Sequence, residues 1–340
     1  MIVRDKSNVF KLLFAWKGTI LPKVLPALSF VVLISACVVW LSYYHWIQIP
    51  TVPAIGFTIF GVILSICTGF RNNACYDRWW EGRKLFPTVP AIGFTIFGVI
   101  LSICTGFRNN ACYDRWWEGR KLWGALIANA RHIVRDSHVL SNEQREHLIH
   151  QVLIFSNLLR DRLRQQTVEP TKFLEHAYLN NSSLNYLNEH INAPQFVLEN
   201  IQKDLVKILK DGEISDIIYS TLNRHIVELG NIQAGCDRIA GTPLPYSYSV
   251  LLHRAVYCFC FILPFSLEAA LGIWTPLIVG LIAYMFLGLD ALSAQIEEPF
   301  GLQENDLPLD SIVRLIERES LSSLGQPLPP IIEAQDNNLL

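Results

Sequence analysis

The side chains whose spacing points most directly to a function are apolar. Val62, Ile66 and Phe70 stand at i, i+4 and i+8, so they form one stripe along a helix. The adjacent stripe consists of small residues, which permit close helix approach in a membrane: Gly61, Ser65 and Gly69. If several subunits arranged this helix around an axis, rings of apolar side chains would result, and such a constriction can gate by dewetting. The alternative is an ordinary lipid-facing or core stripe.

Titratable side chains offer little for catalysis at membrane depth. Glu268 and Asp290 are the acidic residues of the last two predicted spans, 246–267 and 275–289, and their edges, and His253 stands alone. General acid–base chemistry needs such groups in clusters. The eight cysteines show no paired spacing and are interpreted as small apolar fillers rather than disulfides or metal ligands. No enzyme, cofactor or metal site is therefore expected.

The chain contains the same 36 residues twice, letter for letter, at 50–85 and at 87–122. Such identity indicates a recent in-frame tandem duplication or an assembly error. The second copy supplies the same apolar stripe as Val99, Ile103 and Phe107. Each copy ends in a basic, aromatic segment, which on its own is also typical of an ordinary interfacial anchor.

The fold expected is all-α, with several membrane spans. Only 17% of the 340 residues are charged, against roughly 25% in soluble domains. Lys and Arg are missing from 24–70 and from 255–313, and both blocks hold apolar runs near the ~20 residues that cross a bilayer. The spans predicted are 27–43, 54–70, 246–267 and 275–289, which form two helical hairpins.

The segments predicted between and around the spans complete the domain plan. Residues 1–23 form an interfacial amphipathic segment, 24–122 the first hairpin with both copies, and 123–245 a cytosolic helical domain. The second hairpin covers 246–290, and an acidic, proline-containing tail covers 291–340. Ser141 and Gln144 predict a capping box at a helix start.

Charge sets the orientation of the spans. Basic residues precede the first span and follow the second, which places both termini in the cytoplasm. If both copies of the second span crossed the membrane, the polar domain would be exported against this rule. Only one copy can therefore serve as the second span, and either copy joins acceptably to its flanks.

Three blocks of sequence resemble the bestrophin family, and most closely its bacterial branch. They are GFRNN-x-CY-x-RWWEGRKLWG in the repeated unit, CDRIAGTPLPYSYSVLLHR at 236–254 and EEPFGLQENDLPLD at 297–310. The blocks keep the family's order, and the resemblance covers 1 to about 316. The duplicated segment is the one large departure.

The resemblance implies a homopentameric ion channel in the cell inner membrane, with four transmembrane helices per subunit. Its partners would be copies of itself, small inorganic ions and the lipid bilayer, without nucleic acid. The family's second helix lines the pore and forms an apolar neck, which corresponds to Val62, Ile66 and Phe70 or to Val99, Ile103 and Phe107. A second, cytosolic aperture corresponds to Ile218, with Ile217 as the neighbouring candidate. Polar residues at the inner mouth would be Arg71, Asn72 and Asn73, with the copies Arg108, Asn109 and Asn110.

The resemblance leaves ion choice open between anions, by the family's usual description, and monovalent cations, as in some bacterial members. A secondary transporter is the third functional hypothesis. Transporter repeats, however, are diverged and several spans long, whereas the repeat in this chain is short and identical. Eukaryotic members bind calcium just after Pro-Phe-Gly. Here Gln303 replaces an acidic residue of that stretch, so no calcium site is expected. The acidic residues of the tail would instead tie it to a neighbouring surface: Glu297, Glu298, Glu304, Asp306 and Asp310.

Overall fold

The computed structural model describes residues 21–43, 89–166 and 190–334, and all regular elements of these residues are helices. The chain divides into two compact units. Of the described residues, unit 1 holds 115–166, 190–243 and 298–334, and unit 2 holds 21–43, 89–114 and 244–297. Helix α5 (Val89–Asp136) contributes residues to both units.

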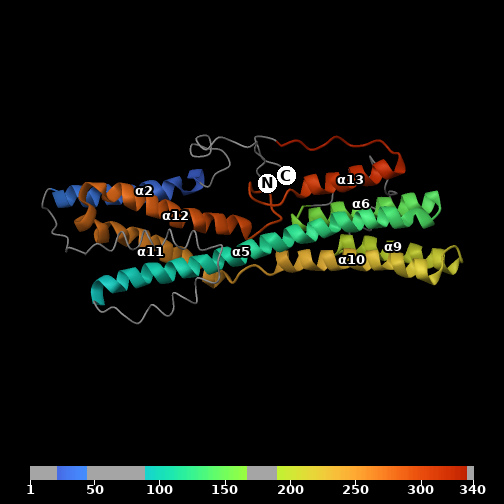
Figure 1. Cartoon of the computed structure of the whole chain (residues 1–340), viewed down its shortest axis with the longest axis horizontal. Coiled ribbons are helices and arrows are strands. Elements are labelled where there is room, and N and C mark those ends of the chain that lie inside the picture. Colours follow the sequence, from blue (N-terminus) through green and yellow to red (C-terminus); the bar gives the residue numbers. More distant parts are fainter. Residues whose placement is uncertain (1–20, 44–88, 167–189, 335–340) are drawn as a thin grey trace. The chain divides into compact units, whose positions relative to one another are not determined.

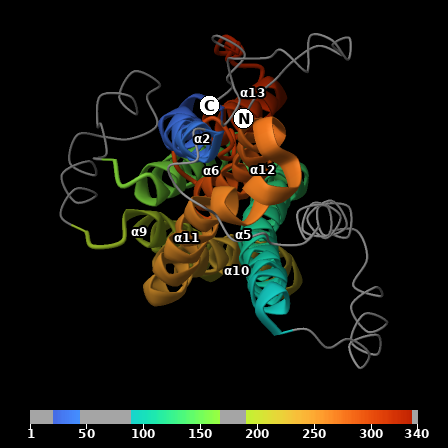
Figure 2. The ribbon, with the colours of Figure 1, turned by 90° about the vertical axis from the view of Figure 1, so that its left-hand side faces the viewer.

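Unit 2 is built from the apolar helices α2 (Leu21–Tyr43), α11 (Tyr246–Leu271) and α12 (Thr275–Ile296), with the first part of α5. Helix α2 packs on α12 and α11, which are joined by a short 3₁₀ turn, η3 (Gly272–Trp274). Figure 2 shows these three helices end-on. Val256, Phe259 and Ile282 are fully buried between them.

The second hairpin lies where the sequence predicts it. Among the described residues, two stretches are long and apolar enough to cross a membrane, Tyr246–Glu268 and Gly272–Ile296, and Val24–Trp40 is a shorter apolar helix. Pro264 lies inside α11 without ending it, whereas Pro276 stands in the first turn of α12. A proline in the first turn loses no helical hydrogen bond. Pro264 therefore does not end α11, and Pro276 stands where α12 begins.

Unit 1 is a bundle of the second part of α5 with α6 (Asn142–Leu163), α9 (Ala193–Lys210), α10 (Asp216–Gly241) and α13 (Leu309–Leu324). Figure 1 shows α6, α9, α10 and α13 running alongside α5, and a 3₁₀ turn, η2 (Ser137–Val139), joins α5 to α6. The core gathers around Trp123, Phe155 and Leu159, which are fully buried. The periodic apolar residues of α6 supply much of this core.

Local sequence signals set where these helices begin. The Ser141 hydroxyl accepts from the Gln144 amide and the Gln144 side chain accepts from the Ser141 amide, which confirms the predicted capping box. Asn192 caps α9 with its side-chain oxygen, which accepts from the Gln195 backbone amide, and Pro194 stands in the first turn. Gly212, just beyond the end of α9, has φ +75°, a conformation that favours glycine.

Candidate functional site

The small-residue stripe of the second copy faces the interior of unit 2. Ser102 is 4% exposed, and its hydroxyl donates to the Gly98 carbonyl at 2.8 Å. A Cβ added at Gly98 would lie 3.2 Å from the Phe259 ring of α11. The Phe259 ring of α11 therefore packs against α5 at Gly98, where the absence of a side chain leaves room for it.

The adjacent stripe of α5, which carries Ile103 and Phe107, is more open. Phe107 is 56% exposed and Ile103 is half-buried, whereas Leu101 and Thr105, on other faces of the helix, are buried. The exposed face continues with Asn110 and Asp114, at i+3 and i+7 from Phe107. This face therefore carries an aromatic side chain, then an amide, then a carboxylate. Val99 belongs to the same helix. The first-copy residues Val62, Ile66, Phe70, Arg71, Asn72 and Asn73 lie outside the described residues.

Arg108 does not share the open face with Asn110. It is 6% exposed, and its Nη1 lies 2.5 Å from Asp290 Oδ1 while Nη2 lies 3.4 Å from Glu297 Oε2. The other Asp290 oxygen contacts His253 Nδ1 at 2.6 Å. The positive charge of Arg108 is thus neutralised inside unit 2. Sequence periodicity gave no signal for these partners.

Asn109 lies between the buried and the open face. Its side-chain oxygen accepts a hydrogen bond from the Ser293 hydroxyl at 3.2 Å. Ser293 stands on α12, one turn beyond Asp290, so the polar residues after Phe107 hold α5 to α12 twice. Of the three predicted inner-mouth residues in this copy, Asn110 is the exposed one.

In unit 1 the basic aromatic segment of α5 is a docking surface for both other sequence blocks. Arg115 donates to the carbonyls of Thr242 and Ile239 at 2.5 and 2.6 Å, and Arg238 pairs with Glu118. These contacts fix the end of α10. Arg115 and Glu118 of α5 therefore hold the 236–254 block. Arg115 donates to its backbone carbonyls, and Glu118 pairs with its Arg238 side chain.

The third block meets the same segment. The Trp116 indole donates to the Asn305 carbonyl at 3.0 Å. Gly119 is buried, and a Cβ there would lie 3.0 Å from the Phe300 ring and 3.3 Å from Leu307. The glycine of the RWWEG motif therefore makes room for the phenylalanine of Pro-Phe-Gly. The Arg120 guanidinium lies 5.6 Å from the centroids of the Trp116 and Trp117 rings.

The acidic residues of the tail have separate partners. Glu297 belongs to unit 2, whereas Asp310 in unit 1 pairs with Arg160 at 3.3 Å and with Arg164 at 2.6 Å. Glu298 is exposed and Glu304 half-buried. Among the described residues, no three His, Cys, Asp or Glu side chains are grouped as a metal would require.

Asp306 closes the loop after Pro-Phe-Gly. It is 3% exposed, and its Oδ2 accepts from the Gln303 amide at 2.7 Å. Burial raises the pKa of the Asp306 carboxyl above its ordinary value, and the hydrogen bond from Gln303 opposes that rise. The carboxyl serves as a turn cap within this loop.

The two candidates for the cytosolic aperture differ in exposure. Both stand in the first turn of α10, whose start is capped by Ser215. Ile217 is 80% exposed, while Ile218 is half-buried and packs against the core of unit 1. The exposed apolar side chain is Ile217.

Comparisons with known proteins agree on one family. A family model described as bacterial/fungal bestrophin protein matches residues 1–91 and 85–322. The chain is 33% identical to a voltage-dependent anion channel-forming protein of Mesorhizobium japonicum, over 98% of this chain and 96% of that protein. It is also 33% identical to the voltage-dependent anion channel-forming protein YneE of Escherichia coli K12, over 94% and 93%. A crystal structure of a bacterial bestrophin homolog from Klebsiella pneumoniae matches with a TM-score of 0.66 and 31% identity, over 80% of this chain and 98% of that one.

Proposed function

Because this chain belongs to the bestrophin family, we propose that it is a membrane protein that forms a passive channel for small monovalent anions. The observation that carries the proposal is the division of α5 into two faces. One face buries Ser102 and meets the Phe259 ring of α11 at Gly98, and the other leaves Phe107 exposed beside the half-buried Ile103. A large aromatic side chain that is open in the protomer fits an apolar ring at a pore axis.

The assembly proposed is a homopentamer of four-span subunits in the inner membrane, with both termini cytoplasmic. Two apolar stretches, Tyr246–Glu268 and Gly272–Ile296, and the helices α2 and α5 would supply the four crossings. The positive residues at the N-terminus and after Phe107 support this orientation. The cytosolic domain would then correspond to 123–245, and the tail from 291 would return to it.

We assign the working pore helix to the second copy of the repeat. In this copy the apolar stripe and the basic aromatic segment belong to one uninterrupted helix, Val89–Asp136. That helix also holds the other two sequence blocks through Trp116 and Gly119. If the pore helix is continuous with its cytosolic anchor, a movement of the anchor would move the pore-lining side chains as well.

The cytosolic aperture is assigned to Ile217 rather than Ile218. An aperture residue must leave its own subunit to form a ring with its symmetry mates. Ile217 is free to do so, whereas Ile218 contributes to the core of unit 1.

A cation channel is the second candidate, and one observation favours it. Asp114 lies on the same open face of α5 as Phe107 and Asn110, while the charge of Arg108 is neutralised by Asp290 and Glu297. Carboxylate rings favour cations in pores. The names of the relatives favour anions.

The reversal potential of single-channel currents in planar bilayers, under a KCl gradient, tests the function. A reversal near the chloride equilibrium potential supports the anion channel, and one near the potassium potential supports the cation channel. Saturable, ion-coupled uptake into liposomes without unitary currents would contradict both and indicate a transporter.

A further inference from the structure

His225 of α10 contacts the end of α5 through both nitrogens of its ring. Nε2 lies 2.9 Å from Oδ2 of Asp136, the last residue of α5, and Nδ1 lies 3.1 Å from Oδ1 of Asn129. All three residues belong to unit 1, and His225 follows the proposed aperture residue Ile217 by about two turns of α10. The imidazole therefore joins the first half of α10 to the end of α5.

The orientation of the Asn129 amide decides what His225 Nδ1 must do. Asn129 is 5% exposed, and its Nδ2 donates to the His225 carbonyl at 2.8 Å. If the amide were turned over, two oxygens would face each other at that point, so the amide oxygen faces the ring and is an acceptor. On the other side, the hydrogen bond with His225 lowers the pKa of the Asp136 carboxyl below its ordinary value, so that group is an anion and also an acceptor.

Two acceptors on one imidazole require two donors. A neutral imidazole carries one N–H group and one unprotonated nitrogen, whereas the imidazolium ion carries two N–H groups. The imidazolium form of His225 is therefore the form that donates to Asn129 and Asp136 together. Since histidine ordinarily changes its charge between about pH 5 and about pH 8, the number of hydrogen bonds made here follows the pH.

Other charged and titratable groups near the ring come from α5 and from α10 itself. On α5, the exposed His132 ring lies edge-on with its centroid 5.8 Å away, and Arg135 Nε lies 3.6 Å from the second Asp136 oxygen. On α10, Arg224 and Glu228 are exposed. Because water and salt screen these exposed charges, Asp136 is the carboxylate that acts on the ring by direct contact.

We propose that His225 is a positioning residue for conduction, and that its imidazolium form holds the aperture end of α10 against α5. This rests on the proposed function, with Ile217 at the aperture. Loss of the proton to solvent leaves an unprotonated ring nitrogen facing an oxygen, so one of the two hydrogen bonds breaks and the start of α10 is held less firmly. The aperture then discriminates less by size, and the permeability of a large anion relative to chloride rises.

Bilayer currents of the full chain, with chloride on one side and gluconate on the other, test this at about pH 5.5 and about pH 8.5, on either side of the ordinary histidine pKa of about 6.5. The gluconate-to-chloride permeability ratio should rise with pH in the wild type, and this rise should be lost in His225→Gln. Asp136→Asn should move the midpoint of the rise to lower pH, because a neutral amide attracts the imidazolium less than a carboxylate does.

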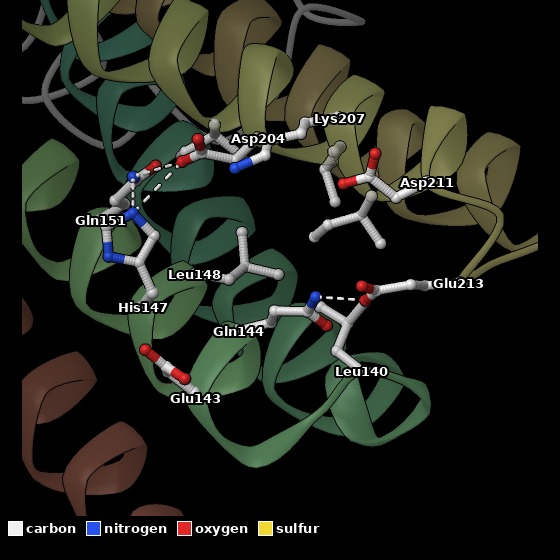
Figure 3. Close-up of a pocket in the computed structure, with 13 residues that line it drawn as sticks. Leu140, Glu143, Gln144, His147, Leu148, Gln151, Asp204, Lys207, Asp211 and Glu213 are labelled. Atoms are coloured by element: carbon white, nitrogen blue, oxygen red, sulfur yellow. Dashed lines mark hydrogen bonds and ion pairs between the residues drawn. The ribbon is translucent and has the colours of Figure 1, made fainter.

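His147 of α6 provides the matched control. Its side chain is 59% exposed, and its Nε2 lies 3.2 Å from Asp204 Oδ2 (Figure 3). That contact joins α6 to α9 instead of α10 to α5, so His147→Gln should keep the pH profile of the wild type. A profile that survives in His225→Gln, or one that is lost equally in His147→Gln, would overturn the proposal.

If His225→Gln does not fold by circular dichroism, Asp136→Asn carries the test through the midpoint alone. The ring nitrogens of His225, measured by NMR at about pH 5.5, give a readout that does not depend on conduction. Two protonated nitrogens are expected, and one unprotonated nitrogen would overturn the proposal. Currents that are absent at every pH would instead overturn the proposed function, and with it the role of His225 in conduction.

Discussion

Arg108 and Asp290 form a buried ion pair with 2.5 Å between Nη1 and Oδ1, although 182 residues separate them in the sequence. Glu297 provides a second carboxylate at 3.4 Å. The pair joins α5, the helix that carries the proposed neck, to the end of α12. Arg108 directly follows Phe107 in the sequence. The pair therefore holds the residue next to Phe107 on α5 to α12.

Arg108→Gln should lower the thermal unfolding midpoint strongly. It leaves Asp290 and Glu297 buried without their cation, and breaking a buried pair costs about 3–5 kcal/mol. Arg131→Gln is the matched control, since it removes an exposed pair with Glu319 and should cost less than about 1 kcal/mol. Midpoints measured in one detergent compare the two. An Arg71→Gln variant that is as unstable as Arg108→Gln would contradict the assignment of the second copy.

Phe107→Ala and Ile103→Ala should raise single-channel conductance, because each replaces a large side chain by a small one and so widens the apolar constriction. The matched controls are Phe70→Ala and Ile66→Ala in the first copy, which are expected to leave the currents unchanged. Currents altered only by the first-copy variants would transfer the pore to residues 50–85. If all four variants conduct as the wild type, the neck assignment is wrong.

Gly119→Ala should destabilise unit 1 by about 1–3 kcal/mol, the usual cost of overpacking. Its Cβ would lie 3.0 Å from Phe300 and 3.3 Å from Leu307. Gly124→Ala stands on the same helix with nothing within 4 Å, and should instead stabilise the helix by up to about 1 kcal/mol. Denaturation followed by circular dichroism compares the two. Equal effects of the two substitutions would contradict the proposed contact between the sequence blocks.

Ile217→Ala should change the channel conductance, whereas Ile218→Ala should lower the stability of the fold. Ile217 is 80% exposed, so its truncation should change stability by no more than about 0.5 kcal/mol while altering conductance. Ile218 packs on the core, so its truncation should cost about 1–2 kcal/mol, below the 2–5 of a fully buried site. Bilayer currents and unfolding midpoints of both variants test this. A conductance change confined to Ile218→Ala would reverse the assignment.

His147 should titrate above its ordinary pKa of 6.5. The hydrogen bond with Asp204 raises the pKa of the imidazole and lowers that of the Asp204 carboxyl. The protonated imidazole therefore stabilises the fold below pH 6.5, and this contribution is lost as the pH rises through the higher folded-state pKa. Imidazole chemical shifts measured by NMR should show the raised value, and Asp204→Asn should return it toward 6.5. Glu143→Gln should have a smaller effect, since its charge is the smallest of the raising causes.

The sequence by itself predicted the all-helical class and the two apolar helices Tyr246–Leu271 and Thr275–Ile296. The Ser141–Gln144 capping box, the apolar periodicity of α6 and the hairpin from Tyr246 are all local patterns, because they depend on residues within a few turns of one another. The apolar and small stripes of the repeated unit were likewise readable from spacing. The three sequence blocks pointed to the family.

Only the tertiary structure showed which polar residues are exposed and which are engaged in buried ion pairs. Arg108, expected at the inner mouth, is buried because Asp290 and Glu297 approach it from α12. Ile217 and Ile218 are adjacent and identical in type, so spacing could not show which one packs on the core. Such partners come from distant segments, and pairing over long sequence separations follows from packing rather than from local periodicity. That is the physical reason why the apolar stripe of α5 could be predicted and the ion-pair partners of its charged residues could not.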